Sequence, residues 1–237
     1  MNIGHIFNSL LVYPLLNLLV FFYHYIPDIG VVIILLTVLI RLVLLPSFHK
    51  SLKQQKALAE LQPKMNEIKE KYKDDKEAQA KATMELYQVH KVNPLSSCLP
   101  LLIQLPILIA LYQVFIKSLS GKTLVGLYSF VHAPQSINPI FLHFLNLAHT
   151  NVVMAFLAGI LQYFQSRLML PKTRSDDPTA RMLAYQTMYF LPAVTILLGI
   201  RFPAGLTLYW VVTTLFGIGQ QYYILRKEAK GALNAAQ

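Results

Sequence analysis

The chain has 237 residues, of which 55% are hydrophobic and 14% are charged, and its mean hydropathy is +0.47. This composition is typical of a protein dissolved in lipid. It excludes a large water-soluble domain, because each membrane crossing needs roughly 20 apolar residues and little chain is left over. With a single cysteine the chain cannot form an internal disulfide, so a disulfide-stapled extracellular module is excluded too. We therefore expect an all-α, multi-pass membrane protein.

The first apolar stretch, residues 6–26, is long enough to cross a membrane, but its polar residues gather on one face. Tyr13, Asn17 and His24 recur there at helical intervals. This pattern favours an amphipathic helix that lies in the membrane interface, and a first membrane-spanning helix is the alternative. We predict that residues 1–28 form this unit on the extracytoplasmic side.

The next apolar run, about residues 30–47, contains a positive charge, Arg41, with no acidic residue beside it. A guanidinium in hydrocarbon costs about 2.5–3.5 kcal/mol on insertion scales, unless water or a partner relieves it. Two interpretations remain open at this point. Arg41 stands five positions before Pro46, so its side chain could snorkel to the helix end. Alternatively, it is a functional cation that faces a hydrated cavity.

The composition changes abruptly after Pro46, because residues 49–93 carry ten lysines and seven acidic residues. Apolar or small residues recur three and four apart on both sides of a charged break at residues 73–75. We therefore predict an antiparallel helical hairpin in water. Its mixed charges are more typical of a solvated face than of a binding patch, although the hairpin could also serve as a handle for a partner.

Four more apolar segments complete a predicted five-span core over residues 29–225. The predicted spans are about 30–47, 95–116, 151–168, 182–200 and 205–225, with a polar loop at 169–181 and a tail at 226–237. Of the 21 Lys and Arg residues, 17 lie in the hairpin, in or beside this loop, and in the tail. The positive-inside rule places these parts in the cytoplasm, which predicts an N-out, C-in topology. The net charge of +10 then reports topology and attraction to anionic lipid rather than nucleic-acid binding.

Catalytic motifs are missing from the sequence. None of the 11 acidic residues falls within a predicted span, and the histidines lie at helix ends and in loops, which disfavours a proton-coupled carrier. Hydrolase, metalloprotease and phosphate-binding motifs are absent as well. We predict no catalytic residue, no metal site and no cofactor. For the uncharged polar residues within the spans, an interhelical hydrogen bond is the simpler interpretation. These residues are Thr37, Gln104, Gln162, Gln165, Thr207, Tyr209, Trp210, Thr213 and Thr214.

Two long motifs resemble the signatures of the YidC/Oxa family of membrane protein insertases. They are NPLSSCLPLLIQLP at residues 93–106 and FPAGLTLYW at residues 202–210, the second followed by Gln220 and Gln221. The charged hairpin and the five-span layout also resemble this family, and the likeness covers residues 6–225. We expect a bacterial member without a large extracytoplasmic domain, in which residues 6–26 form the surface helix.

The resemblance implies a polar groove in the inner leaflet, open to the cytoplasm and to lipid and closed toward the outside. Arg41 matches the single arginine of that groove, and Thr37 and Trp210 match positions that face or border it. Gln162 or Gln165 matches a further lining position, while Gln104 and Tyr209 lie within the two motifs and complete the candidate groove. Thr213 and Thr214 depart from the family pattern, because many relatives have an Asn in that stretch.

The implied function is that of a membrane protein insertase or chaperone in the plasma or inner membrane. It would receive hydrophobic nascent chains in the groove and release them laterally into the lipid bilayer, without catalysis. Ribosome, targeting receptor and Sec translocon are candidate partners of the cytoplasmic hairpin, and no specific nucleic acid is expected. Two other classes stay open: an ion or solute channel or carrier, and a folding chaperone accessory to the translocon.

Overall fold

The computed structural model describes residues 3–93, 95, 99–119, 124–169 and 178–235, and these are mostly helical. Pro94 and residues 96–98 of the first motif, and residues 170–177 of the predicted loop, lie outside the described residues. The helices that precede the loop region are α1 (Ile3–Phe7), the π-helix η1 (Asn8–Val12), α2 (Tyr13–Tyr25), α3 (Ile29–Val43), α4 (Leu45–Glu60), α5 (Gln62–Lys71), α6 (Lys76–Val89) and α7 (Leu99–Leu119). The later elements are β1 (Ile140–Phe141), β2 (Leu145–Asn146), α8 (Val152–Met169), α9 (Pro178–Tyr185), the π-helix η3 (Gln186–Phe190), α10 (Leu191–Gly199) and α11 (Ala204–Ala235).

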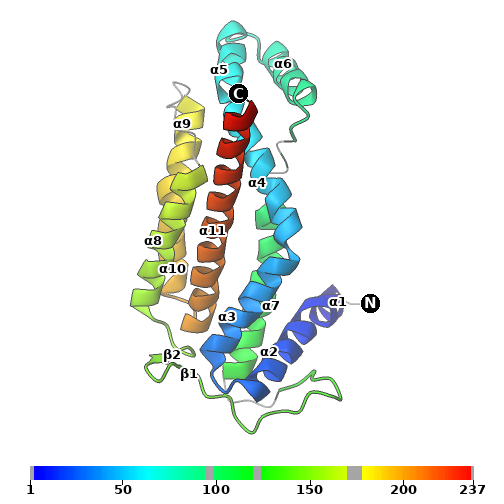
Figure 1. The fold of residues 1–237 in the computed structure, drawn as a ribbon, viewed down its shortest axis with the longest axis vertical. Helices are drawn as coiled ribbons and strands as arrows, with labels where there is room; N and C mark the ends of the chain where they lie inside the picture. The colour runs from blue at the N-terminus through cyan, green and yellow to red at the C-terminus, as the bar shows by residue number, and fades with distance from the viewer. Residues whose placement is uncertain (1–2, 94, 96–98, 120–123, 170–177, 236–237) are drawn as a thin grey trace.

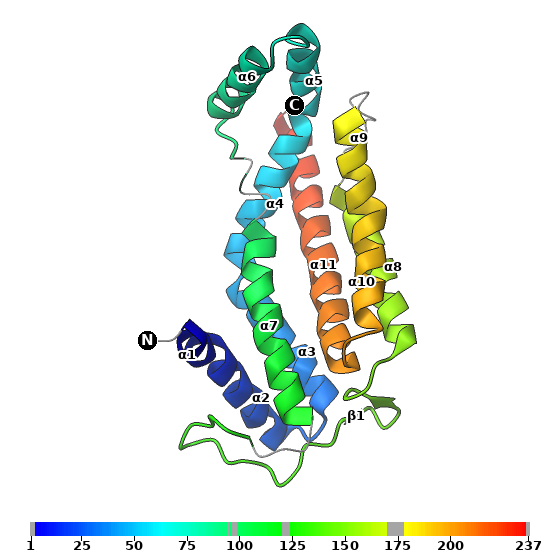
Figure 2. The same ribbon diagram turned by 180° about the vertical axis from the view of Figure 1, so that it is seen from behind.

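The long helices α3, α7, α8, α10 and α11 run along the longest axis of the molecule (Figure 1). Helix α11 packs against α3, α7, α8 and α10, and α8 also packs against α10. The α5–α6 hairpin lies at one end of this bundle, and the β1–β2 hairpin lies at the other end together with the start of α3 (Figures 1 and 2). The buried apolar core draws on α2, α3, α7 and α11.

Helix α3 begins at a capping carboxylate and ends before a proline. Asp28 Oδ1 accepts hydrogen bonds from the backbone N–H groups of Gly30 and Val31, at 2.9 and 3.2 Å. At the other end, Pro46 has no N–H to continue the helical ladder, and α4 departs at 64° from α3. The helix therefore stops at Val43, earlier than the predicted end of this span at residue 47.

A short β-hairpin covers the beginning of α3. Its Leu142 N–H donates a hydrogen bond to Asp28 Oδ2, at 2.9 Å, so the capping carboxylate also anchors the hairpin. The Phe141 ring lies against Gly30, where an added Cβ would stand 2.0 Å from Phe141 Cδ2. Leu142 and His143 adopt positive φ values of 48° and 67° in the turn. The backbone of the β-hairpin, the Phe141 ring and the Asp28 carboxylate together cover this end of the bundle.

Asn17 and Tyr23 of the N-terminal helix are buried and bond to another segment of the protein. Asn17 is 3% exposed, and its amide donates to the Gly126 carbonyl at 2.9 Å while its oxygen accepts from the Tyr128 N–H at 2.7 Å. The Tyr23 hydroxyl accepts from the Asn138 N–H at 2.9 Å. These bonds tie α2 to the connection between α7 and α8.

The α5–α6 hairpin forms as predicted in the charged segment, with its turn at residues 72–75. Asp75 caps α6 by accepting from the N–H groups of Glu77 and Ala78. The long first helix is divided at Leu61, just before Pro63 in the first turn of α5.

Length and hydropathy identify membrane-crossing candidates among the described residues. Two helical stretches, Gly4–Tyr25 and Leu102–Leu119, are long and apolar enough, and the bent pair α3–α4 gives a third if it is taken as one span. Val152–Leu168 and Gln186–Gly199 are shorter apolar helices. The coarser part of the prediction, a mostly helical protein with membrane-crossing helices, is therefore confirmed.

Candidate functional site

Arg41 lies in the last turn of α3 and is buried, with 8% of its side chain exposed. Its guanidinium carbon lies 4.5 Å from the centroid of the Phe48 ring on α4. Within the part of the chain that the structure describes, no carboxylate lies at ion-pair distance from Arg41. The charge is therefore buried beside an aromatic face and without an acidic partner among these residues.

Two other predicted site residues, on α7 and α11, bond to each other, and one of them interacts with Arg41. Tyr209 on α11 is 2% exposed, and its hydroxyl accepts a hydrogen bond from the Gln104 side-chain amide on α7. The Arg41 guanidinium is near enough to this hydroxyl to interact with it electrostatically. We call these three residues the Arg41 cluster. It joins α3, α7 and α11, and it includes one residue from each of the two sequence motifs.

Helix α11 carries further buried polar side chains beyond Tyr209. Thr213, Thr214 and Gln221 are 7%, 1% and 5% exposed, respectively. Among the described residues, the Gln221 Oε1 and Gln220 Nε2 atoms are buried and find no hydrogen-bond partner. Polar atoms of this kind are uncommon in a dry protein interior, because each unmet hydrogen bond raises the free energy of burial. Helix α11 therefore carries buried polar atoms whose hydrogen bonds neither lipid nor the described residues supply.

The remaining predicted site residues make contacts of their own or are half-buried. Thr37 is 1% exposed, and its hydroxyl donates to the Ile33 carbonyl at 2.6 Å, one turn back in the same helix. Gln165 on α8 lies against Gly217 of α11, where an added Cβ would stand 2.3 Å from the Gln165 Nε2. Gln162 and Trp210 are half-buried on α8 and α11.

Phe48 is the site residue that the sequence analysis missed. It is 8% exposed, and it follows Arg41 by seven residues, which is about two helical turns. That spacing places the two residues on one face of a helix and would have signalled the pair. Because an apolar aromatic residue near a helix end normally suggests packing, the signal is easy to overlook.

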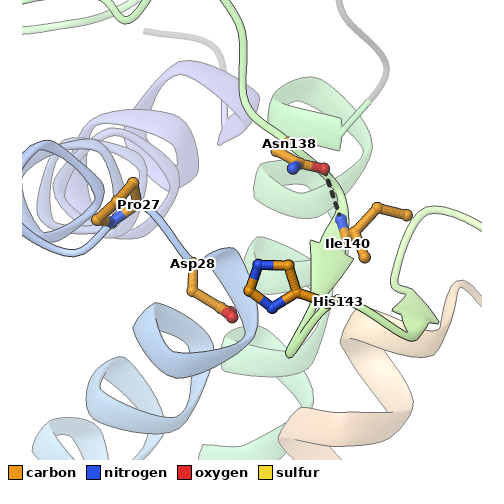
Figure 3. Close-up of a pocket in the computed structure, with 5 residues that line it drawn as sticks. All are labelled: Pro27, Asp28, Asn138, Ile140 and His143. Atoms are coloured by element: carbon orange, nitrogen blue, oxygen red, sulfur yellow. Dashed lines mark hydrogen bonds between the residues drawn. The ribbon is translucent and has the colours of Figure 1, made fainter.

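A separate pocket of about 250 Å³ lies at the opposite end of α3 and is lined by Pro27, Asp28, Asn138, Ile140 and His143. In Figure 3 the His143 ring stands beside Asp28, and the Asn138 side chain bonds the Ile140 N–H. Both Asp28 oxygens already accept backbone hydrogen bonds. No group of three His, Cys, Asp or Glu side chains suited to a metal ion occurs among the described residues. The pocket is thus part of the capping structure.

Comparison with known proteins identifies the family. The family model described as "60Kd inner membrane protein" matches residues 21–231. The "Membrane protein insertase YidC" of Pelobacter propionicus is 38% identical over 211 residues, which cover 89% of this chain and 38% of that protein. The protein of the same name from Geobacter sulfurreducens is 38% identical over 220 residues, covering 92% of this chain and 38% of that protein.

A solved structure agrees in fold and in sequence. The "Active YidC insertase crystal structure with the first transmembrane domain resolved" matches with a TM-score of 0.63 and 26% identity, covering 92% of this chain and 46% of that chain. The present chain thus spans 38% of the length of the curated relatives given above. The predicted resemblance to the YidC/Oxa insertases is confirmed, and this helical, multi-pass protein of the inner membrane belongs to the 60Kd inner membrane protein family.

Proposed function

We propose that this chain is a membrane protein insertase and chaperone. It receives a hydrophobic nascent chain in a polar groove of the inner leaflet and releases it sideways into the bilayer. The observation that carries this proposal is Arg41, a buried cation with no acidic partner among the described residues, held beside Tyr209 and Gln104. A membrane protein keeps such a charge where water solvates it or where an oppositely charged partner pairs with it. In this proposal the partner is the client.

The groove is lined by Arg41, Thr37, Gln104, Gln162, Gln165, Tyr209 and Trp210 in this proposal. Support comes from the Arg41 cluster, from the polar atoms of Gln220 and Gln221 that lack partners among the described residues, and from the contact of Gln165 with α11. Water in such a groove would satisfy these atoms. It would also shorten the hydrocarbon path that a polar client tail has to cross.

Physical forces suffice for the transfer without catalysis. Burial of a new apolar span releases roughly 25 cal/mol per Å² of apolar surface. Two opposite charges 4 Å apart attract by about 4 kcal/mol at an effective dielectric of 20, so Arg41 would draw an acidic tail into the groove. An inside-negative potential of 100 mV adds about 2.3 kcal/mol for each acidic charge that moves outward.

The topology that fits this function has five spans, with the N-terminus outside and the C-terminus in the cytoplasm. The spans correspond to α3, α7, α8, the continuous α9–η3–α10 segment and α11, so that the core covers residues 29–225. Residues 1–28 form the extracytoplasmic surface helix. In favour of this, α1 and α2 diverge from the long bundle axis (Figure 2) and are held by hydrogen bonds to the α7–α8 connection.

The cytoplasmic part comprises residues 49–93, the loop 169–181 and the tail 226–237. We assign the α5–α6 hairpin to docking of the ribosome, a targeting receptor or the Sec translocon, or to reception of the client itself. The hairpin lies at the far end of the bundle (Figure 1), and neither α5 nor α6 contains a buried residue among those described, so its charged side chains are accessible to such partners. If a chain lacking residues 60–85 inserts clients at the normal rate in cells, the hairpin has no such role.

The decisive experiment reconstitutes the purified chain in liposomes and offers one short single-span client, with insertion scored by protease protection. Insertion by the chain alone, at a rate well above that of empty liposomes, supports the proposal. Ion flux without insertion would instead identify a channel or carrier. Binding of the client without insertion would identify a folding chaperone that is accessory to the translocon.

A further inference from the structure

We infer that Phe48 is a positioning residue for Arg41: its ring holds the guanidinium at the α3–α4 bend so that the N–H groups stay available to acidic clients. The inference rests on the proposed insertase function and extends it to a residue outside the groove. Preference for acidic client tails would then depend on an aromatic ring at position 48 as well as on the arginine.

The backbone brings the two side chains together across a break in the helix. Arg41 occupies the last turn of α3 and Phe48 the first turn of α4, and the two helices meet at 64°. Side chains of a helix lean toward its N-terminus, so the Phe48 ring leans back toward the end of α3. The guanidinium carbon consequently lies 4.5 Å from the ring centroid, and each side chain is 8% exposed.

The chemistry of this contact differs from that of an ion pair. A guanidinium carries five N–H donors in its plane, and an aromatic ring beside it offers no oxygen acceptor that competes for them as a carboxylate would. The ring quadrupole attracts the cation and replaces part of the lost hydration, more strongly where water is excluded. A carboxylate partner would have occupied the same donors. The ring therefore fixes the charge in place while leaving it free to bind an acidic group.

A second arginine–aromatic pair provides a matched control. Arg226 lies 5.0 Å from the centroid of the Tyr222 ring on α11, a geometry close to that of Arg41 and Phe48. Tyr222, however, is 53% exposed, so water competes with the ring there. Loss of the Tyr222 ring should therefore leave client selectivity unchanged.

The test uses the full chain in liposomes with four variants: Phe48→Leu, Phe48→Met, Phe48→Tyr and Tyr222→Leu. The first readout is the ratio of insertion rates for two single-span clients that differ in having an acidic or a neutral tail. We expect Phe48→Leu and Phe48→Met to lower this ratio about five-fold. Phe48→Tyr and Tyr222→Leu should retain it. The use of two apolar replacements keeps the test valid if one of them fails to fold.

The second readout does not depend on insertion. Phenylglyoxal modifies exposed guanidinium groups, and peptide mass spectrometry gives the rate at Arg41 relative to the exposed Arg201 in the same sample. We expect this relative rate to rise several-fold in Phe48→Leu and to stay unchanged in Phe48→Tyr. If the wild type inserts neither client while this pattern holds, the insertase proposal fails and the positioning role stands. An unchanged rate in Phe48→Leu, or equal loss of selectivity in Phe48→Tyr and Phe48→Leu, overturns the positioning role.

Discussion

The side-chain amide of Gln104 on α7 donates a hydrogen bond to the hydroxyl of Tyr209 on α11. Gln104 belongs to the motif at residues 93–106 and Tyr209 to the motif at residues 202–210, so one bond connects the two motifs. Because Tyr209 is 2% exposed and interacts with Arg41, this bond also fixes the polar surroundings of the cation.

This bond should contribute measurably to stability. In a double-mutant cycle with Gln104→Leu and Tyr209→Phe, we expect a coupling free energy of about 0.6 kcal/mol, with an upper value near 1.7, as for other hydrogen bonds between membrane helices. The measurement is reversible unfolding in mixed micelles of mild detergent and SDS. Additive single changes, with no coupling beyond experimental error, would mean that the pair is not bonded in the folded protein.

Replacement of Arg41 should impair the insertion of clients according to the charge of their tails. Arg41→Ala removes the attraction for acidic tails, so insertion of a client with an acidic tail should fall much more than insertion of a neutral one, while Arg41→Lys should be milder. Arg201→Ala is the control, because Arg201 is exposed between α10 and α11. Protease protection in liposomes provides the measurement. Equal insertion of both clients by the wild type and by Arg41→Ala would contradict the electrostatic role.

Asp28 should stabilise two elements at once. Asp28→Ala removes the cap of α3 and also the acceptor for the Leu142 N–H, so we expect a loss of about 1–3 kcal/mol in the free energy of unfolding. Hydrogen exchange should accelerate at the first turn of α3 and at residues 140–146. Asp28→Asn keeps one carbonyl acceptor and should lose less.

Asp75→Ala is the matched control for Asp28. Asp75 caps α6 with the same two-bond pattern, and both of these bonds come from the first turn of its own helix. Its loss should speed exchange in α6 and leave the β1–β2 hairpin protected. If Asp28→Ala changes exchange only within α3, then the carboxylate does not anchor the β-hairpin.

The helices could be predicted from the sequence because their signals are local, and the groove candidates came from the resemblance of the two motifs to a known family. Runs of apolar residues, the charged hairpin and the two motifs each lie within one continuous segment, and they led to Arg41, Gln104 and Tyr209. The structure adds that these three residues lie together. Thr37 was expected to line the groove from the resemblance, and the structure adds that its hydroxyl donates to the Ile33 carbonyl within α3.

The features that could not be predicted from the sequence depend on contacts between segments far apart in the chain. Asn17 gave the N-terminal stretch an interfacial pattern, but its partners Gly126 and Tyr128 lie more than 100 residues away in a connection without periodicity. Helical periodicity shows which residues share a face and says nothing about what covers that face. Phe48 was missed for a related reason, because it lies just beyond the predicted end of the span at residue 47 and its contact with Arg41 depends on the angle at which α4 leaves α3.

The interface between α8 and α10 makes the sharpest packing prediction. Gly159 lets the two helices approach closely: a Cβ there would stand 2.3 Å from Ile196 Cγ1 and 3.2 Å from the Pro192 carbonyl oxygen. Gly159→Ala should therefore force the helices apart and lower the free energy of unfolding by about 1–3 kcal/mol. The measurement is unfolding in the same mixed micelles.

Gly219→Ala on α11 is the control, because a Cβ at that position meets no atom within 4 Å. Alanine is the better helix former, so this change should be neutral or should stabilise the protein by about 0.5–1 kcal/mol. Opposite signs for the two Gly→Ala changes would separate close packing from intrinsic helix propensity. If Gly159→Ala stabilises the protein as much as Gly219→Ala does, then α8 and α10 are not packed at this distance in the folded protein.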